Sequence, residues 1–237
     1  IPIHLFTDDG VIFAHNLSWN AVPKNGDAIN VTFAPQAQML FRKMRMTSRL
    51  LKEIATVYNG VKPYETGKGN PPQTAEIIRC NPFVITGKEK PSVPHWLPLL
   101  RGSLIHRYVT YWQNNSWIKY GEWLAAPRDP TIFQAPEKLF VRQTGDSIIA
   151  THGEENVVAR NNLHIILPKD SLNLSFLLGV LNSRCIDFLY AFINPEKGEV
   201  LAEVKKNHVE TLPIPNATNM QQKPIVEIVD RDRKSVV

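Results

Sequence analysis

The stretch GVKPYETGKGNPPQT, residues 60–74, contains the tetrapeptide Asn70-Pro71-Pro72-Gln73. Enzymes that methylate an exocyclic base nitrogen use a similar loop, in which Asn or Asp precedes two prolines and an aromatic residue. The loop accepts the amino protons, and the aromatic ring stacks on the flipped base. Gln73 occupies the aromatic position, and an amide offers no such stacking face.

A catalytic loop of that kind also needs a preceding nucleotide-binding half, with a Gly-rich turn between a strand and a helix that cradles the cofactor. The 69 residues before Asn70 provide no such half. We therefore expect residues 60–74 to serve a purpose other than catalysis.

Basic residues suggest what that purpose is. The chain has 27 Lys and Arg against 22 Asp and Glu, a formal net charge of +5 and a pI near 9.2. One basic cluster lies within residues 42–52, and further basic residues mark loops and strand ends. A solvated face explains any one cluster, but their combined distribution favours a surface that binds phosphates. The later positions are Lys62, Lys68, Arg101, Arg107, Arg128, Arg142, Lys205 and Lys206.

Two other arrangements could carry metal chemistry. Asp187 with Glu203-Val204-Lys205 imitates the acid set of metal-dependent nucleases, which needs its acids on adjacent strand ends. Asp187 falls in an apolar stretch expected to be helical, so a free-standing nuclease remains only an alternative. His152, Glu154 and Glu155 lie on one expected loop, but no further ligand lies at the spacing of a metal site. We therefore predict no metal site.

The two cysteines and the hydropathy bear on the cellular compartment. Cys80 and Cys185 lie outside any C-x-x-C spacing, so we expect both to be buried, free thiols. No apolar run approaches the ~20 residues that span a bilayer, and no signal peptide opens the chain. These features predict a cytoplasmic protein.

The elements that position these residues follow from hydrophobic periodicity, caps and turn residues. They predict an α+β fold, a mixed β-sheet with flanking helices and a helical hairpin. Two stretches rich in Gly and Pro, 60–74 and 81–98, should be loops. Strands are expected within 10–15, 138–144, 147–152 and 161–168, and residues 48–60 should form a short helical turn that leads into a strand ending at Gly60. Helices are expected at 35–46, at 172–193 (capped by Asp170-Ser171 and broken near Asn182-Ser183), just before Pro213, and at 221–230.

Six motifs in this order resemble a known family. They are YNGVKPYETGKGNPPQT, LLRGSLIHRYV, GEWLAAPR, EKLFVRQTGDSIIATHGEENVVARNNLHIILP, FLLGVLNSRCIDFLYAFI and GEVLAEVKKNHVETLPIP. The succession resembles the TaqI-like C-terminal specificity domain. This is the DNA target recognition domain of adenine-specific DNA methyltransferases and of fused restriction-modification enzymes.

The resemblance implies a division of the chain. Residues 35–230 would form the recognition domain, and residues 1–34 a strand and linker that follow a methyltransferase domain upstream of Ile1. That missing domain would hold S-adenosylmethionine and methylate the N6 of adenine, with or without a nuclease in the same polypeptide. Residues 231–237 would be a non-native tail, because residues 232–237 match the translation of a common sequencing adapter. The alternative is a specificity subunit of a type I restriction-modification system.

The resemblance also implies that the partner is double-stranded DNA. Such a domain needs cations for phosphates and amide, hydroxyl or guanidinium groups for base edges. Gln73 either reads an adenine or holds its own loop in shape. Arg107 supports the fold as much as it contacts DNA. The implied DNA-binding residues are Lys62, Tyr64, Thr66, Lys68, Gln73, Thr74, Arg101, Arg107, Arg128, Arg142, Thr144, Lys205 and Lys206.

Overall fold

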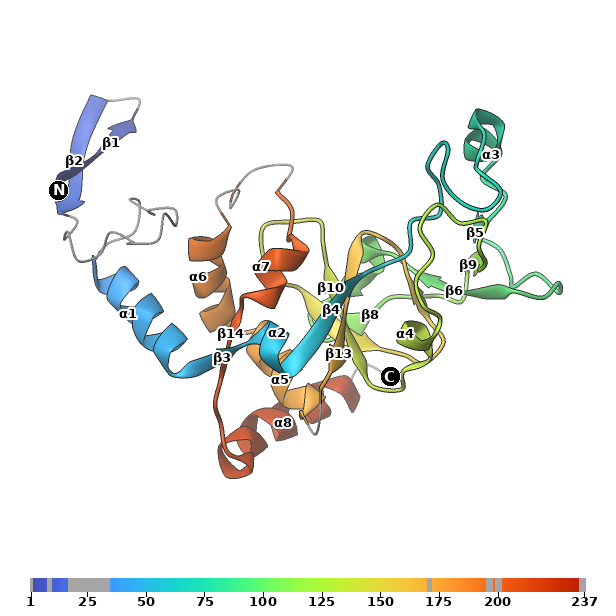
Figure 1. Cartoon of the computed structure of the whole chain (residues 1–237). Coiled ribbons are helices and arrows are strands. Elements are labelled where there is room, and N and C mark those ends of the chain that lie inside the picture. Colours follow the sequence, from blue (N-terminus) through green and yellow to red (C-terminus); the bar gives the residue numbers. More distant parts are fainter. Residues whose placement is uncertain are drawn as a thin grey trace. The chain divides into compact units, whose positions relative to one another are not determined.

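A computed structural model describes residues 2–7, 10–16, 35–169, 172–194, 198 and 202–234 (Figure 1). The chain divides into two compact units, Ile1–Arg49 and Leu50–Val237. Asp170 and Ser171, the expected helix cap, lie outside the described residues, as do most of the expected linker and the last three residues of the tail.

The first unit contains a β-hairpin and one helix. Strands β1 (Pro2–Thr7) and β2 (Gly10–Asn16) pair antiparallel. Helix α1 (Pro35–Met46) has the predicted bounds, and its proline stands at a first position that needs no N–H donor. Helix α1 belongs to the N-terminal unit. Strand β3 (Ser48–Leu50) crosses the boundary between the units.

The larger unit is built on two four-stranded sheets, which confirms the predicted α+β class. The first sheet has the order β11-β10-β13-β4, with every neighbouring pair antiparallel. Its members are the predicted strands: β4 (Ala55–Asn59), β10 (Lys138–Arg142), β11 (Ala150–Gly153) and β13 (Leu163–Pro168).

The second sheet was not predicted. Its order is β12-β6-β9-β5; β12 and β6 run parallel, while the other pairs are antiparallel. Residues 81–98, expected to be loop, contribute β5 and the start of β6, so that expectation was wrong. These strands are short, and Pro98 interrupts β6, so their periodicity is weak. The bounds are β5 (Val84–Thr86), β6 (Trp96–Leu100), β9 (Ser116–Lys119) and β12 (Val158–Ala159).

The main core joins residues of the two sheets. Leu99, Leu100 and Ile118 of the second sheet belong to one buried cluster with Phe140 and Ile165 of the first. Each such side chain contributes roughly 1.5–3 kcal/mol when removed from water. Leu139 and Val141 flank Phe140 and are equally buried, as expected for a strand covered on both faces.

Helices cover the other face of the first sheet. Helix α5 (Leu174–Leu181) contacts β10, β11 and α8 (Asn219–Lys234). The predicted break at Asn182-Ser183 is confirmed, because Ser183 caps α6 (Arg184–Ile193) and Asn173 caps α5. Helix α7 (Lys206–Glu210) ends before Pro213, as predicted. The remaining elements are α2 (Leu51–Ile54), α3 (Ala75–Cys80), α4 (Thr131–Gln134), the 3₁₀ helix η2 (Gly102–Leu104), β7 (Ile105–His106), β8 (Val109–Thr110) and β14 (Pro213–Pro215).

Two expectations about surface and membrane can be compared with the structure. Cys80 and Cys185 form no disulfide within the described residues and both are exposed, so the expectation that they are buried was wrong. Among the described residues, no single helix is long and apolar enough to cross a bilayer; α5 and α6 meet that criterion only as a pair bent by 64°.

One buried cation holds the end of α4. Lys138 is fully buried, and its Nζ donates hydrogen bonds to the carbonyls of Phe133 (2.9 Å) and Ala135 (2.6 Å). Both carbonyls lie where the helix ends and lack a helical donor. Burial lowers the pKa of Lys138 to about 8, although the carboxylates of Glu155 and Glu154 oppose that change.

The lowered pKa of Lys138 predicts a pH-dependent stability. Between about pH 8 and the unfolded pKa near 10.4, the unfolded chain binds the extra proton, so this group's contribution to the unfolding free energy rises with pH. Relative to Lys138→Met, the wild type should therefore gain stability over this window in urea titrations. Exposed Lys88→Met is the control. A difference between wild type and Lys138→Met that is constant with pH would refute the prediction.

Candidate nucleic-acid interface

The 60–74 loop is organised around the side chain of Gln73, which is only 2% exposed. Its Nε2 donates hydrogen bonds to the carbonyls of Pro63 (2.8 Å) and Trp123 (2.7 Å), and its Oε1 accepts one from the backbone N–H of Glu65 (2.9 Å). Reading an adenine would require breaking these bonds, since the same amide atoms face the base edge. The geometry favours the second of the two roles considered for Gln73, that of holding its own loop in shape.

Backbone contacts also tie the loop to the 121–124 segment. The N–H of Asn70 donates to the carbonyl of Glu122 (2.9 Å), and its side-chain amide donates to the Glu122 carboxylate. Gly69 has φ +88°, and a Cβ there would lie 2.5 Å from the carbonyl oxygen of Trp123. Only glycine meets both demands without strain. The loop is therefore a braced structure.

The two lysines of the loop differ in their contacts within the chain. Lys68 and Thr66 are exposed, and Lys68 forms no ion pair in the described part of the chain, although its charge also lowers the pKa of Glu65. Lys62 instead forms an ion pair with Glu65 (2.8 Å), and the pair lowers the pKa of the Glu65 carboxyl. Lys68 is thus the loop cation that is available to an external anion.

Tyr64 and Thr74 mainly support local structure. The Tyr64 hydroxyl accepts a hydrogen bond from the N–H of Phe83 (2.6 Å), and the two rings stack 5.6 Å apart. Burial raises the pKa of Tyr64. Thr74 is the N-cap of α3, because its hydroxyl accepts from the N–H of Ile77. Both residues keep the loop in place for its exposed neighbours.

A second group of predicted residues lies where strands of the two sheets end. Arg101 follows β6, Arg142 ends β10, and the Nε of Arg142 donates to the Thr144 hydroxyl (3.1 Å). Arg142 also approaches the η2 turn, since a Cβ on Gly102 would lie 3.5 Å from its Cγ. The fold thus brings Arg101, Arg142 and Thr144 into one neighbourhood.

Arg160 joins this group, although the sequence analysis did not select it. It directly follows β12, which runs parallel to β6, and its N–H donates to the carbonyl of Leu100 (2.9 Å). Burial lowers the pKa of Arg160, and the positive charge of Arg101 lowers it further. The only signal in the sequence was an arginine directly after the short apolar run VVA.

The other predicted basic residues have partners within the chain. Arg107 pairs with Asp187 of α6 (2.6 Å), and the Nε of Arg128 donates to the carbonyl of Asn59 (3.0 Å). Lys206 pairs with Glu210 within α7 (3.3 Å), and Lys205 is exposed at the N-cap of that helix. Arg107 and Arg128 therefore act first as contacts that hold the fold together.

The acid set considered for a nuclease is not assembled. The carboxylate of Asp187 forms an ion pair with Arg107. Across the described residues, no group of three His, Cys, Asp or Glu side chains is close enough to hold a metal ion.

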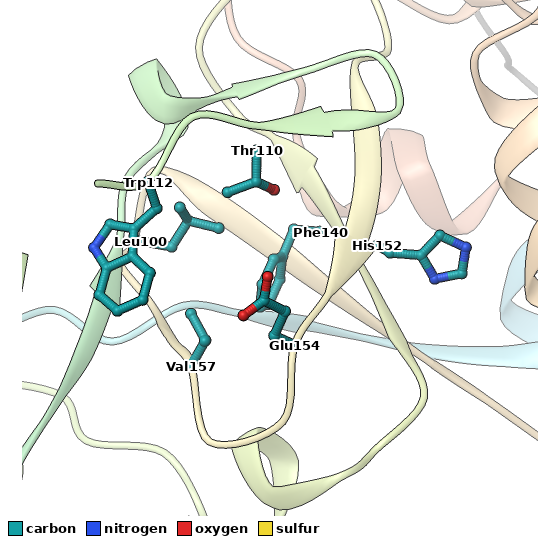
Figure 2. A pocket seen from close by; sticks show the side chains of 7 residues that line it. All are labelled: Leu100, Thr110, Trp112, Phe140, His152, Glu154 and Val157. Atoms are coloured by element: carbon teal, nitrogen blue, oxygen red, sulfur yellow. The ribbon is translucent and has the colours of Figure 1, made fainter. Parts of the chain in front are cut away.

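A small cavity is lined by residues of both sheets, Leu100 of β6 and Phe140 and His152 of β10 and β11 (Figure 2). In Figure 2 the imidazole of His152 points away from the carboxylate of Glu154, so the two do not form a shared site. The cavity volume is about 10 Å³, room for about one water molecule and not for a flipped base. Its lining residues are Leu100, Thr110, Trp112, Phe140, His152, Glu154 and Val157.

Known proteins resemble this chain over part of its length. Residues 97–214 match the TaqI-like C-terminal specificity domain. A type II restriction enzyme and methyltransferase of Methanocaldococcus jannaschii is 28% identical over 107 residues, which is 43% of this chain and 9% of that protein. The matched family segment excludes the 60–74 loop but contains Arg101, Arg142 and Arg160.

Two solved structures share the fold. The type IIG restriction endonuclease BpuSI superposes with a TM-score of 0.50 and 11% identity, over 82% of this chain and 28% of its own. The type IIL restriction-modification enzyme MmeI, solved in complex with DNA, superposes with a TM-score of 0.50 and 14% identity, over 80% of this chain and 29% of its own. The chain spans less than a third of each of these relatives. Through residues 97–214, it belongs to the family of TaqI-like C-terminal specificity domains.

Proposed function

We propose that this chain recognises the double-stranded DNA target of a site-specific adenine N6 methyltransferase or a fused restriction-modification enzyme. The observation that carries the proposal is a set of cations without carboxylate partners in the described part of the chain: Lys68 on the braced loop, and Arg101, Arg142 and Arg160 at the strand ends. Cations of this kind bind the phosphates of a duplex and set its position.

Base contacts would come from exposed polar groups between these cations. The hydroxyls of Thr66 and Thr144 are exposed, and Arg142 can turn its guanidinium to a guanine edge. Gln73 would take part indirectly, because its hydrogen bonds set the course of the loop that carries Thr66 and Lys68. The specific DNA sequence would follow from the loop geometry.

Methyl transfer would take place in another part of the parent polypeptide. S-adenosylmethionine would supply the methyl group in such enzymes, and we propose that the methyltransferase domain holds it. A cofactor of that size needs a cleft of several hundred Å³, whereas the cavity in Figure 2 has about 10 Å³. We place the methyltransferase domain elsewhere in the same polypeptide and the enzyme in the cytoplasm. A second recognition half encoded downstream would instead indicate a type I specificity subunit.

The direct test is binding of the 237-residue chain to a randomised duplex library, followed by sequencing of the bound fraction. The proposal requires enrichment of one short site and binding that weakens steeply with salt. Equal recovery of all sequences, or no binding at low salt, would contradict it.

The proposed division of labour predicts that this chain has no methyl transfer activity by itself. Duplex DNA incubated with the chain and S-adenosylmethionine carrying a labelled methyl group should stay unlabelled, while a complete adenine methyltransferase labels the same DNA. Label above background at adenine would show that a catalytic site lies within these residues.

Lys68→Ala should weaken binding to every duplex alike, because the exposed ammonium contacts a phosphate and no base. The slope of log K against log[salt] should become shallower by about 0.9, the value for one lost phosphate contact. The matched control is Lys223→Ala on α8, an exposed lysine outside the proposed surface. An altered site preference with an unchanged salt slope would rule out the phosphate role.

Gln73→Ala should destabilise the loop and lower affinity without changing the preferred site. Leaving the Pro63 and Trp123 carbonyls without their buried donor costs about 1–3 kcal/mol in the free energy of unfolding. Urea unfolding and library selection measure the two effects, with exposed Gln134→Ala as control. A relaxed preference at one base pair with normal stability would instead assign Gln73 to base reading.

A further inference from the structure

Arg101 and Arg160 are brought together by a parallel pairing of strands from distant parts of the chain. Leu100, the last residue of β6, pairs with Ala159, the last residue of β12. Arg101 and Arg160 are the next residues on these two strands, and the N–H of Arg160 continues the pairing to the Leu100 carbonyl. In a parallel pair, opposite residues direct their side chains to the same face.

The backbone around this pair is closely held. The N–H of Val61 donates to the Ala159 carbonyl and the N–H of Asn161 to the Val61 carbonyl (both 2.8 Å). Gly60 packs so closely that a Cβ there would lie 2.1 Å from the carbonyl oxygen of Arg160. On the other strand, the N–H of Gly102 donates to the side chain of Asn162 (3.1 Å). The two arginines therefore start from fixed positions.

No counter-charge accompanies the pair within the described residues. Neither arginine forms an ion pair with a carboxylate there, in contrast to Arg107. The Nε of Arg101 is buried and lacks a hydrogen-bond partner in the same residues. Both side chains are partly buried, and the positive charge of Arg101 lowers the pKa of Arg160. The two positive charges repel each other, and an anion bound by both guanidinium groups would offset this repulsion.

We propose that Arg101 and Arg160 together bind one phosphate group of the DNA backbone. The inference rests on the proposed DNA-binding function and adds a defined anchor point to it. Two guanidinium groups offer planar donor forks that match phosphate oxygens. Because the Arg101 side chain is only partly buried, a change of its rotamer would bring its Nε–H, which lacks an acceptor within the described residues, to the same phosphate. A phosphate in this place would position the duplex relative to the braced 60–74 loop, since Tyr64 of that loop lies close enough to influence Arg160 electrostatically.

The test uses the 237-residue chain and a duplex of about 20 base pairs carrying the selected site. Arg160→Ala and Arg101→Ala should each lower affinity about tenfold or more at low salt, as expected for a lost charge-assisted hydrogen bond. Each should also make the salt slope shallower by about 0.9 and leave the site preference unchanged. Arg231→Ala on α8 is the control, because that arginine is exposed and lies outside the proposed surface.

A readout on the wild-type chain guards against variants that do not fold. In ¹⁵N–¹H spectra of the arginine side chains, the Nε–H signal of Arg101 should shift when the duplex is added, whereas that of Arg231 should stay in place. A shift of the Arg101 signal together with lower affinity of the variants supports the anchor point.

The outcomes separate the two proposals. If the wild-type chain binds the duplex but the Arg101 signal and the affinities of both variants are unchanged, the phosphate anchor is refuted and the DNA-binding function stands. If the wild-type chain does not bind duplex DNA at all, the proposed function fails and the anchor fails with it.

Discussion

The buried amide of Gln73 is the contact on which the candidate DNA surface depends. An irregular loop with several glycines would lose much conformational entropy if it had to order itself at the moment of binding. The hydrogen bonds from Gln73 to Pro63, Trp123 and Glu65 fix this order beforehand. They also link the loop to the 121–124 segment, whose Leu124 lies in the main core. The exposed Lys68 is therefore carried by a loop that is anchored to the folded body of the larger unit.

The sequence predicted those elements whose signals are local. The strands at 138–144 and 161–168 have long apolar runs, and the helical hairpin is a long apolar stretch with a polar break at Asn182-Ser183, so their patterns are strong. The N-cap of α5 is Asn173, although the sequence had suggested Asp170-Ser171. The second sheet was missed because its strands have two to five residues and become strands only through pairing across the chain. The sequence of residues 81–98 has no strand pattern, and β5 becomes a strand through its antiparallel pairing with β9.

The sequence identified the basic residues of the candidate site, but not which of them form ion pairs or hydrogen bonds within the fold. Lys62, Arg107 and Arg128 look as suitable for phosphates as Lys68 does when only the sequence is considered. Partners supplied by folding decide between them: Glu65 is three residues from Lys62, whereas Asp187 is eighty residues from Arg107. The Arg101–Arg160 pair likewise arises only from the parallel register of β6 and β12. No sequence pattern records that register, because parallel neighbours need not be close in the chain.

Two cationic groups in this fold show how burial can serve opposite purposes. Lys138 is removed from water, but its Nζ donates hydrogen bonds to the carbonyls of Phe133 and Ala135 at the end of α4, so this cation is satisfied within the chain. The guanidinium of Arg101 is partly buried as well, yet its Nε–H has no acceptor within the described chain. Buried donors in folded proteins are nearly always satisfied, by the protein, by water or by a ligand. The neighbouring charge of Arg160 is positive, so the acceptor that suits this donor best is an anion, in line with the proposed phosphate contact.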